Sequence, residues 1–450
     1  MKSQIAISLS ILFGLLFRVS LGASEIATAP SAGNPFVTSI FTADPSAHAW
    51  QDGRLYVYPS RDIDPPKGCD RMDRYHSYST DDMVHWRDEG ELLRASQIDW
   101  GRPEGGFMWA PDCAYRNGVY YFYFPHPSST KWNDSWKIGV ATSDKPASGF
   151  KPVGYIKGVG GYAMIDPAVF TDTDGQAYLY FGGGGKCVGV RLKETMTELD
   201  GELRPMEGLV DFHEATWVFK RNGLYYLTYA DNNPRENRLC YAISKNPLGP
   251  WEYKGVYLEP TGCDTSHGSV VEFKDQWYAF YHNAAISGRG NLRSICVDRL
   301  EFTQDGSIKT VVQTKTGVPA AGPHKDSQYR STVYKAEKAV LSEGATISGQ
   351  SAILPAKSNA TLVFASVDGG SNGGRFSLDI SHANAALAKL NLTVNNEDQS
   401  LVNAIATGSI YSFTGHLVIT IPLSAGNNNT LSLTLVSGEL AVDRITITPL

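Results

Sequence analysis

The feature that most constrains the fold of this chain is a strand pattern that recurs five times. The five segments are DGRLYVYPS at 52–60, NGVYYFYFP at 117–125, DGQAYLYFGG at 174–183, NGLYYLTYA at 222–230 and KDQWYAFYHN at 274–283. Four of them open with Asp-Gly or Asn-Gly, the strongest short hairpin signal, and all five continue with residues typical of strands. Each segment is therefore predicted to be the second strand of a hairpin.

The distance between successive segments leaves room for about four short strands in each repeat. Turn residues separate the segments, and helical periodicity is almost absent. The pattern predicts an all-β chain in which residues 34–312 form a five-bladed β-propeller. An irregular β-sandwich is the alternative interpretation of the same repeat.

The second part of the chain has a different composition. All nine tryptophans lie between Trp50 and Trp277, and the last part has none. Residues 313–332 are rich in Pro, Gly and polar residues, which is typical of a linker. Short alternating segments such as RFSLDIS and HLVITIPL follow, and they predict a C-terminal β-sandwich over 333–450.

The N-terminus predicts export. Residues 1–23 combine an early lysine, an apolar run and small residues, as a signal peptide does. The six cysteines permit up to three disulfides, and we assign none. We expect a secreted, extracellular monomer, and the four N-x-S/T sequons, at Asn133, Asn359, Asn391 and Asn428, fit a glycoprotein. The formal net charge of −6 argues against nucleic acid or an anionic membrane as a partner.

Acidic residues occupy equivalent positions of the repeat. Eight residues before the turn, the first four units hold Asp44, Trp109, Asp166 and Glu214, and the fifth holds Ser266 beside His267. If the strands that follow line the central axis, these residues meet in one pocket. Because neighbouring carboxylates repel and lose hydration on burial, stability alone does not favour such a cluster.

Three acids in one pocket can hydrolyse a glycosidic bond. A protonated carboxyl donates to the leaving oxygen, while an ionised one activates water or attacks the anomeric carbon. A third negative charge raises the pKa of the acid. A flat ring such as Trp109 can also stack on the apolar face of a sugar. The repeat therefore predicts a carbohydrate-cleaving enzyme.

Four motifs in order resemble glycoside hydrolase family 43: ADPSAHAW at 43–50, MIDPAVFTDTDGQAYLYFGG at 164–183, FHEATWVFKRNGLYYLTYA at 212–230 and TSHGSVVEFKDQWYAFYH at 265–282. The resemblance implies a five-bladed propeller, an inverting mechanism and removal of terminal pentose units from plant cell-wall polysaccharides. It implies that Asp44 is the general base, Asp166 the residue that tunes the acid, and Glu214 the general acid. Inversion predicts that the carboxyls of the base and the acid lie about 6.5–9.5 Å apart.

The resemblance also implies binding residues. His267 matches the family histidine that lies near the channel axis, often beside calcium, although no cofactor is required. Arg293 resembles the family arginine that reaches the substrate from the last blade. Phe107 and His48 are further candidate substrate contacts. The opening YKAEKAV and the closing VDRITITPL of the C-terminal unit resemble a carbohydrate-binding module of family 6 type.

Two alternatives stay open. Related propeller enzymes that cleave fructosides have a retaining mechanism, but the residues beside all three acids differ here from their motifs: Ala43, Ile165 and Ala215. A noncatalytic, lectin-like propeller is the alternative from another class. The sequence does not choose between arabinose and xylose, because the same three acids serve both sugars.

Overall fold

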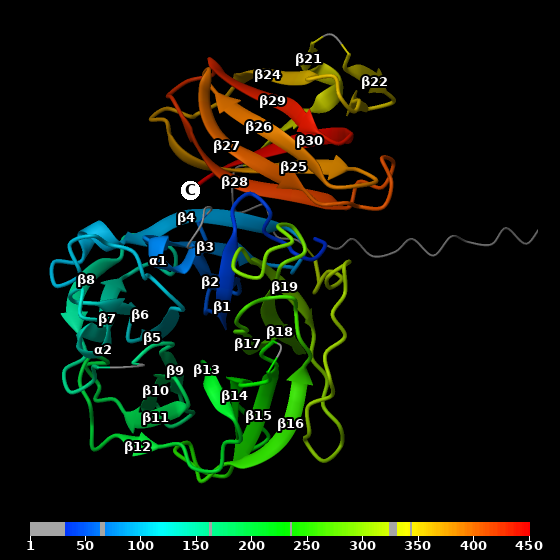
Figure 1. The fold of residues 1–450 in the computed structure, drawn as a ribbon. Helices are drawn as coiled ribbons and strands as arrows, with labels where there is room; N and C mark the ends of the chain where they lie inside the picture. The colour runs from blue at the N-terminus through cyan, green and yellow to red at the C-terminus, as the bar shows by residue number, and fades with distance from the viewer. Residues whose placement is uncertain (1–31, 64–67, 162–163, 235, 324–330, 343) are drawn as a thin grey trace, which may run out of the picture.

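The computed structural model describes residues 32–63, 68–161, 164–234, 236–323, 331–342 and 344–450. The predicted signal peptide, residues 1–23, lies outside this range. The described chain consists almost entirely of antiparallel strands (Figure 1). Two short helices, α1 (Gly68–Arg71) and α2 (Trp132–Ser135), interrupt the strands, together with 3₁₀ turns at Ala95–Gln97 and Ala336–Lys338. None of the described helices could cross a membrane.

Five small sheets follow one another along the first part of the chain. The first is β1 (Thr42–Ala49), β2 (Leu55–Arg61), β3 (Arg74–Thr80) and β4 (Trp86–Arg94). The second is β5 (Asp112–Arg116), β6 (Val119–Pro127), β7 (Trp136–Ser143) and β8 (Lys151–Tyr155). The third is β9 (Ala168–Thr171), β10 (Ala177–Gly183), β11 (Lys186–Arg191) and β12 (Arg204–Pro205). The fourth is β13 (Phe212–Arg221), β14 (Leu224–Asp231), β15 (Leu239–Ser244) and β16 (Glu252–Leu258). The fifth is β17 (Ser269–Phe273), β18 (Gln276–Asn283) and β19 (Ser294–Arg299).

Each repeated segment of the sequence forms the second strand of its sheet, as predicted. The turns before β6 and β14 hold Asn-Gly pairs in which both residues have positive φ, at Asn117–Gly118 and Asn222–Gly223. Such a turn matches the twist of the two strands it joins. The all-β prediction is confirmed, and the five sheets are consistent with propeller blades.

The first strands of the five sheets lie at the centre of this unit. Strand β5 contacts β1 and β9, β13 contacts β9 and β17, and β17 also contacts β1. The segment before β1 reaches the fifth sheet, where the amide of Phe36 donates to the carbonyl of Ile295 over 3.1 Å. The side chain of Asn34 also bonds to both backbone groups of Val297 at 2.9 Å. Residues at the start of the unit are thereby tied to its last sheet (Figure 1).

The C-terminal part contains two larger sheets. One holds β20 (Thr332–Lys335), β22 (Thr346–Ser348), β23 (Ser351–Leu354), β25 (Gly374–Ala383), β28 (Gly415–Leu423) and β30 (Leu440–Pro449). The other holds β21 (Val340–Leu341), β24 (Thr361–Val367), β26 (Ala388–Val394), β27 (Glu397–Ala404) and β29 (Asn429–Ser437). Both sheets contribute to a single core of buried, mostly aliphatic side chains.

Part of the predicted linker packs against the first unit. Val318 is buried in a cluster with residues of the first and fifth sheets. The amide of Asn34 donates to the carbonyl of Lys315 over 2.9 Å, and that of Ala321 to Asp82 over 2.7 Å. The Pro, Gly and polar residues of this part of the segment therefore belong to irregular backbone that packs against the first unit.

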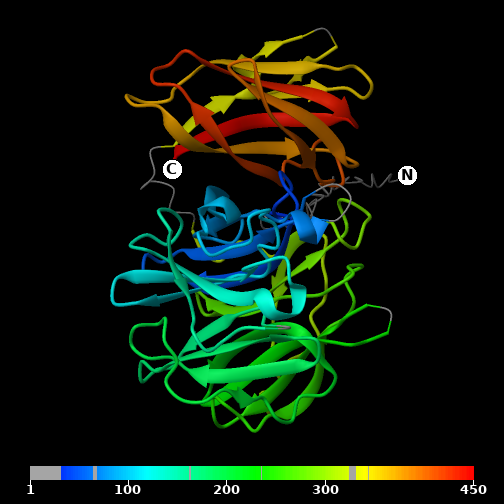
Figure 2. The same cartoon turned by 60° about the vertical axis from the view of Figure 1, so that its left-hand side comes forward.

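The two units meet where β4 contacts β25 and β28 (Figure 2). The amide of Thr420 donates to the buried carboxylate of Asp88 over 2.9 Å, and Arg375 donates to the carbonyl of Glu89 over 3.1 Å. Gly90 has φ +85°, and the Arg375 guanidinium fills the space that a Cβ atom would need. This position therefore requires glycine for both conformation and space.

Five of the six cysteines have described side chains, and these five are buried and free. Thiols are present at Cys113, Cys187, Cys240, Cys263 and Cys296. Burial raises the pKa of the Cys187 thiol above its ordinary value. These side chains act as small apolar groups of the sheet interfaces.

Candidate active site

The starts of the five inner strands line a cavity of about 180 Å³. Its lining residues are Asp44, Met72, Trp109, Ala110, Ile165, Asp166, Glu214, Thr265, His267 and Arg293. Residues far apart in the sequence thus share one pocket because most of them precede or open an inner strand, whereas Met72 and Arg293 precede the third strands β3 and β19. Six of the predicted site residues lie here, and Phe107 and His48 are not among the lining residues.

The backbone at the three acids departs from regular strand geometry. Asp44 and Asp166 have left-handed φ values of 51° and 52°, which confirms that they occupy equivalent positions of the repeat. At Glu214 the pairing of β13 with β14 shifts register on both sides, and the left-handed residue is the next one, Ala215 with φ 68°. Such conformations cost free energy outside glycine and persist only where surrounding contacts enforce them.

Asp44 is held as an ionised carboxylate. One oxygen accepts a hydrogen bond from Arg293 Nη1 over 2.9 Å, and the other accepts one from Ser60 Oγ over 2.7 Å. Burial alone would raise the pKa of Asp44, but the charge of Arg293, two nearby histidines and the hydrogen bond from Ser60 outweigh burial and lower the pKa below its ordinary value. The group therefore stays negative in mildly acidic solution.

Arg293 is aimed at Asp44 by a second acid, Asp62. The Nε and Nη2 atoms of Arg293 donate to the two carboxylate oxygens of Asp62, each over 2.9 Å. The backbone amide of Arg293 donates to the same carboxylate over 2.8 Å. Because a planar guanidinium bound in this way cannot rotate, its remaining Nη1 points at Asp44 and at Thr265, which accepts over 3.1 Å. The sequence predicted Arg293 as a substrate contact; the structure makes it a partner of Asp44.

Asp166 shares the pocket with the other two acids. Its Oδ2 atom accepts a hydrogen bond from the amide of Ala215 over 2.8 Å, and its carbonyl accepts one from Thr216 over 2.6 Å. Burial and then the negative charges of Glu214 and Asp44 raise the pKa of Asp166 well above its ordinary value. The backbone at the bulge in β13 is thereby fixed to the carboxyl that faces it.

Glu214 is the most accessible of the three acids. Its side chain is 19% exposed, compared with 8% for Asp44 and 6% for Asp166. Burial raises the pKa of Glu214, the charge of Asp44 adds to the effect, and His213 and Arg293 oppose it. Two acids with raised pKa values thus face one with a lowered pKa, which separates a proton donor from a proton acceptor.

Two buried histidines, His267 and His282, lie beside the acids of this cavity. Burial lowers the pKa of His267 to about 4 and that of His282 to about 3, so both rings are neutral at pH 7. His282 Nδ1 accepts the amide hydrogen of Asp44 over 3.0 Å, and its Nε2 faces the carbonyl of Thr265 at 2.8 Å. This pairing assigns the ring proton to Nε2. The ring therefore supports the left-handed backbone of Asp44.

The described residues do not form a direct metal-binding shell at His267. Its Nδ1 atom lies 3.7 Å from Asp166 Oδ2. No group of three or more His, Cys, Asp or Glu side chains within the described ranges is arranged to hold a metal ion. Calcium prefers six to eight oxygen ligands, which a lone imidazole does not supply. The calcium ion expected near His267 stays a prediction.

Trp109 supplies the aromatic wall of the cavity. Its carbonyl accepts a hydrogen bond from the buried Tyr75 hydroxyl over 2.6 Å, and its ring lies 4.7 Å from that of Trp136. Phe107 packs edge-on against Trp109 at 5.6 Å and is only 8% exposed. Phe107 therefore lies behind the wall as packing, instead of lining the pocket as predicted.

His48 lies at the opposite end of the inner strands. Its Nε2 atom is 2.7 Å from a carboxylate oxygen of the buried Asp112, and its ring is stacked on Trp50 at 4.8 Å. Four residues of strand separate it from Asp44, or roughly 13 Å. The prediction that His48 contacts the same sugar as Asp44 does not fit this placement.

The sequence analysis missed the residues that hold the acids in place. Asp62 and Ser60 lie at the end of β2, and His282 lies near the end of β18. Ser60 and His282 belong to second strands, which pair directly with inner strands, and Asp62 follows β2 directly. A search for polar residues at the ends of the repeated segments, opposite the acids, would have found them.

The whole first unit matches one family model, that of glycosyl hydrolases family 43, over residues 32–308. The chain belongs to this family. Family membership makes it a glycoside hydrolase and argues against the noncatalytic, lectin-like alternative. Its similarity to relatives named for pentosides also disfavours the fructoside-cleaving alternative.

Curated relatives and solved structures agree with the family. A xylosidase/arabinosidase of Bacteroides ovatus is 36% identical over 60% of this chain and 95% of its own length. Xylosidase/arabinosidase 43A of Humicola insolens is 35% identical over 61% of this chain and 98% of its own. A β-xylosidase/α-arabinofuranosidase from a compost microbial metagenome, solved with xylotriose, has a TM-score of 0.57 and 35% identity over 62% of this chain and 97% of that one.

One solved structure spans both units. An arabinoxylan arabinofuranohydrolase from Bacillus subtilis, in complex with cellotetraose, covers 93% of this chain and 97% of its own, with a TM-score of 0.56. Its sequence identity is 24%, so the likeness concerns the fold. The family 43 unit followed by a two-sheet unit is thus an architecture that this chain shares with a solved protein.

Proposed function

We propose that this chain is a secreted, inverting exo-glycosidase that removes terminal pentose residues from arabinoxylan or a related plant cell-wall polysaccharide, as an α-L-arabinofuranosidase, a β-xylosidase or both. The observation that carries the proposal is the opposed tuning of Asp44 and Glu214 in one small pocket. The names of the relatives support the substrate class.

In the proposed reaction Asp44 is the general base. Held ionised by Arg293 and Ser60, it takes a proton from a water molecule that attacks the anomeric carbon. The contacts on both of its oxygens fix its direction. Inversion requires room for that water between the base and the sugar, which corresponds to carboxyls about 6.5–9.5 Å apart.

Glu214 is the proposed general acid. Its raised pKa keeps a proton available, and its partial exposure supports a position that faces the leaving group. Asp166 is the proposed tuning residue, since burial and then the charge of Glu214 raise the pKa of Asp166, so the two carboxyls do not readily ionise together. Through Ala215 it also sets the backbone beside the acid.

The size of the pocket supports an exo mode of action. A cavity of about 180 Å³ that ends on three acids suits a single sugar ring rather than several. Met72, from the loop after β2, lines it and is part of the region expected to set the sugar preference. Trp109 supplies the apolar face for stacking.

We further propose that the first unit is a closed five-bladed propeller and that the second is a β-sandwich module of carbohydrate-binding family 6 type. The ring of contacts among inner strands and the shared aliphatic core of the two C-terminal sheets support these assignments. Secretion as a monomer after loss of residues 1–23 also belongs to the proposal.

The decisive experiment follows the configuration of the released sugar. Nitrophenyl α-L-arabinofuranoside and nitrophenyl β-D-xyloside are hydrolysed by the purified full chain while proton NMR observes the first-formed anomer. We expect hydrolysis of at least one substrate with the inverted anomer formed first. Release of the retained anomer contradicts the roles given to Asp44 and Glu214, and no hydrolysis of either pentoside contradicts the substrate class.

A further inference from the structure

A second and larger cavity lies at the other end of the inner strands, with a volume of about 520 Å³. Its walls come from the later part of each inner strand, for example Trp50 after β1, Tyr115 in β5, Phe170 in β9 and Phe219 in β13. The acidic pocket is lined by residues that open the same strands. The two cavities therefore open toward opposite ends of the first unit.

A hydrogen-bonded layer around Asp112 separates the two cavities. One oxygen of Asp112 accepts from Ser46 Oγ at 2.6 Å and lies 2.7 Å from His48 Nε2. The other accepts the amide hydrogen of Val169 over 2.6 Å. Because both oxygens are bound within the protein, this layer closes the floor of the larger cavity. A ligand there would not reach the acids.

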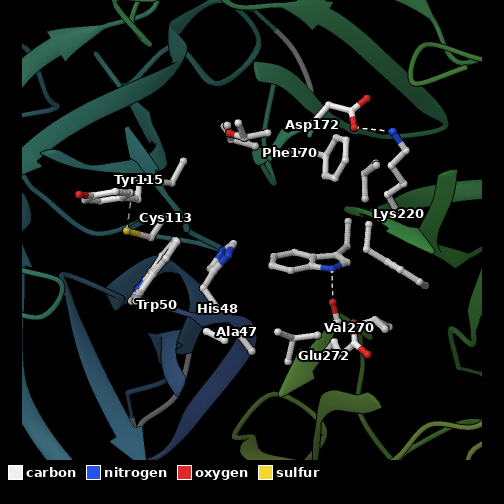
Figure 3. A pocket seen from close by; sticks show the side chains of 18 of the residues that line it. Ala47, His48, Trp50, Cys113, Tyr115, Phe170, Asp172, Lys220, Val270 and Glu272 are labelled. Atoms are coloured by element: carbon white, nitrogen blue, oxygen red, sulfur yellow. Dashed lines mark hydrogen bonds and ion pairs between the residues drawn. The ribbon is translucent and has the colours of Figure 1, made fainter. Parts of the chain in front are cut away.

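Aromatic rings dominate the walls of this cavity. Figure 3 shows Trp50 and Tyr115 on one side and Phe170, beside the pair formed by Asp172 and Lys220, on the other. The indole N–H of Trp50 already donates to Tyr58 over 2.9 Å. The rings thus offer apolar surface rather than free hydrogen-bonding groups, and the rings of Trp50, Tyr115 and Phe170 are partly exposed.

The polar groups of the cavity favour a neutral ligand. Lys220 Nζ and Asp172 Oδ1 lie 2.6 Å apart, so these charges compensate each other. Gln51, Thr171 and Glu272 lie on the lining as exposed side chains that can bond to hydroxyl groups. Aromatic faces combined with a polar rim match a sugar, which has apolar C–H faces and a belt of hydroxyls.

We propose that this cavity is a second, noncatalytic binding site for a neutral pentose oligosaccharide such as xylotriose. The volume lies in the range of pockets that enclose a small-molecule ligand and is larger than that of the acidic pocket. The choice of pentose units rests on the proposed function, whereas the presence of a sugar site rests on the aromatic walls. The site holds glycan without cleaving it, because the acids lie beyond the Asp112 layer.

Calorimetry with xylotriose tests the proposal on the full chain carrying Glu214→Gln, which avoids turnover. We expect two binding sites in this background. Adding Phe170→Ala or Tyr115→Ala weakens one of them by about tenfold, the effect of losing one stacked ring. Thr171→Trp, which fills the cavity and leaves its aromatic wall residues in place, abolishes the same site even if the alanine variants fold poorly.

Two matched variants assign the sites. Trp109→Ala removes binding in the acidic pocket, whereas Tyr411→Ala, at a ring 77% exposed in the C-terminal unit, changes neither site. A single binding site overturns the proposal, and so does a second site that is lost only with Tyr411→Ala. We expect Phe170→Ala to hydrolyse a nitrophenyl pentoside at the rate of the unmutated chain. This measurement tests the proposed catalytic function independently of binding at the second site. If no pentoside is cleaved but two sites remain, the proposed function fails and the second site stands.

Discussion

The two units of the molecule treat buried polar groups differently. The first unit buries Asp44, Asp166 and Arg293 beside a cavity, and the raised pKa of Asp166 marks a charge that the fold does not fully compensate. The C-terminal unit has an aliphatic core, and its half-buried acid Asp379 is paired with His416 at 2.9 Å. Burying uncompensated charge costs stability, so its concentration in the first unit marks the place where chemistry takes priority over stability.

Aromatic residues show the same division. In the first unit the rings form continuous walls around the two cavities, for example Trp109 with Trp136 and Trp50 with His48. The core of the C-terminal unit includes Phe364 and Phe376 but no tryptophan. Aliphatic packing suffices for a stable two-sheet core, whereas ligand surfaces need the rigid faces of large rings. The comparison therefore locates both the proposed reaction and the proposed second site in the first unit.

The largest expected effect tests whether the reaction depends on an acid of the first unit and not on one of the C-terminal unit. Glu214→Gln removes the proposed acid, and we expect turnover of a pentoside with an unactivated leaving group, such as a methyl pentoside, to fall by about a thousandfold while binding of xylotriose persists. Asp379→Asn, the matched change at a half-buried acid of the other unit, leaves turnover unchanged. Initial rates and calorimetry measure both. Retention of more than about a tenth of the activity by Glu214→Gln contradicts its role, given the usual contribution of a positioned acid.

The next prediction tests whether Arg293 positions Asp44 and lowers its pKa. Arg293→Lys keeps a positive charge but cannot bond to Asp62 and Asp44 at once, so we expect kcat to fall by about ten- to hundredfold. Because Arg293 lowers the pKa of Asp44, its loss raises that pKa and moves the acid limb of the pH–rate profile to higher pH. The profile of Arg191→Lys, at a half-exposed arginine paired with Asp200, stays unchanged. An unmoved acid limb in Arg293→Lys means that another group acts as the base.

A smaller effect concerns stability. The folded state raises the pKa of Asp166, so its ionised form is less favourable in the folded chain than in the unfolded one. This free-energy penalty is fully present above the pKa that Asp166 has in the folded chain. It disappears as the pH falls below the pKa that Asp166 has in the unfolded chain. We therefore expect Asp166→Asn to raise Tm by roughly 2 °C at pH 7 and to have no stabilising effect at pH 3. Thermal unfolding at the two pH values measures it, and a lower Tm at pH 7 shows that the acid is a stabilising group.

Much of this fold could be predicted from the sequence because its units repeat. The hairpin turns, the second strands and the equivalence of Asp44 with Asp166 all depend on local signals that recur at similar spacing. His48 shows the limit of this argument, because it belongs to the same strand as Asp44 but lies near the other end of β1. The bond between Arg293 and Asp62 joins residues 231 positions apart, and no local pattern encodes such a pair. Phe107 was misassigned because an aromatic ring beside a pocket and one behind it have the same sequence signature.

The smallest expected effect tests how strongly the two units are joined. Arg375 donates to the carbonyl of Glu89 across the boundary, and its guanidinium occupies the space beside Gly90. An exposed contact of this kind contributes less than about 1 kcal/mol, so Arg375→Ala is expected to lower the unfolding free energy by no more than that. Gly90→Ala costs more, because a left-handed φ of +85° disfavours alanine and the new Cβ displaces the guanidinium. In the double variant the guanidinium is absent, so the cost of displacing it disappears and the cost of the left-handed φ remains. The loss of unfolding free energy in the double variant is therefore smaller than the sum of the two single losses. Denaturant unfolding of the four proteins measures this coupling. Strict additivity would mean that the guanidinium does not lie against Gly90 and that the contact between β4 and the C-terminal unit is looser than described.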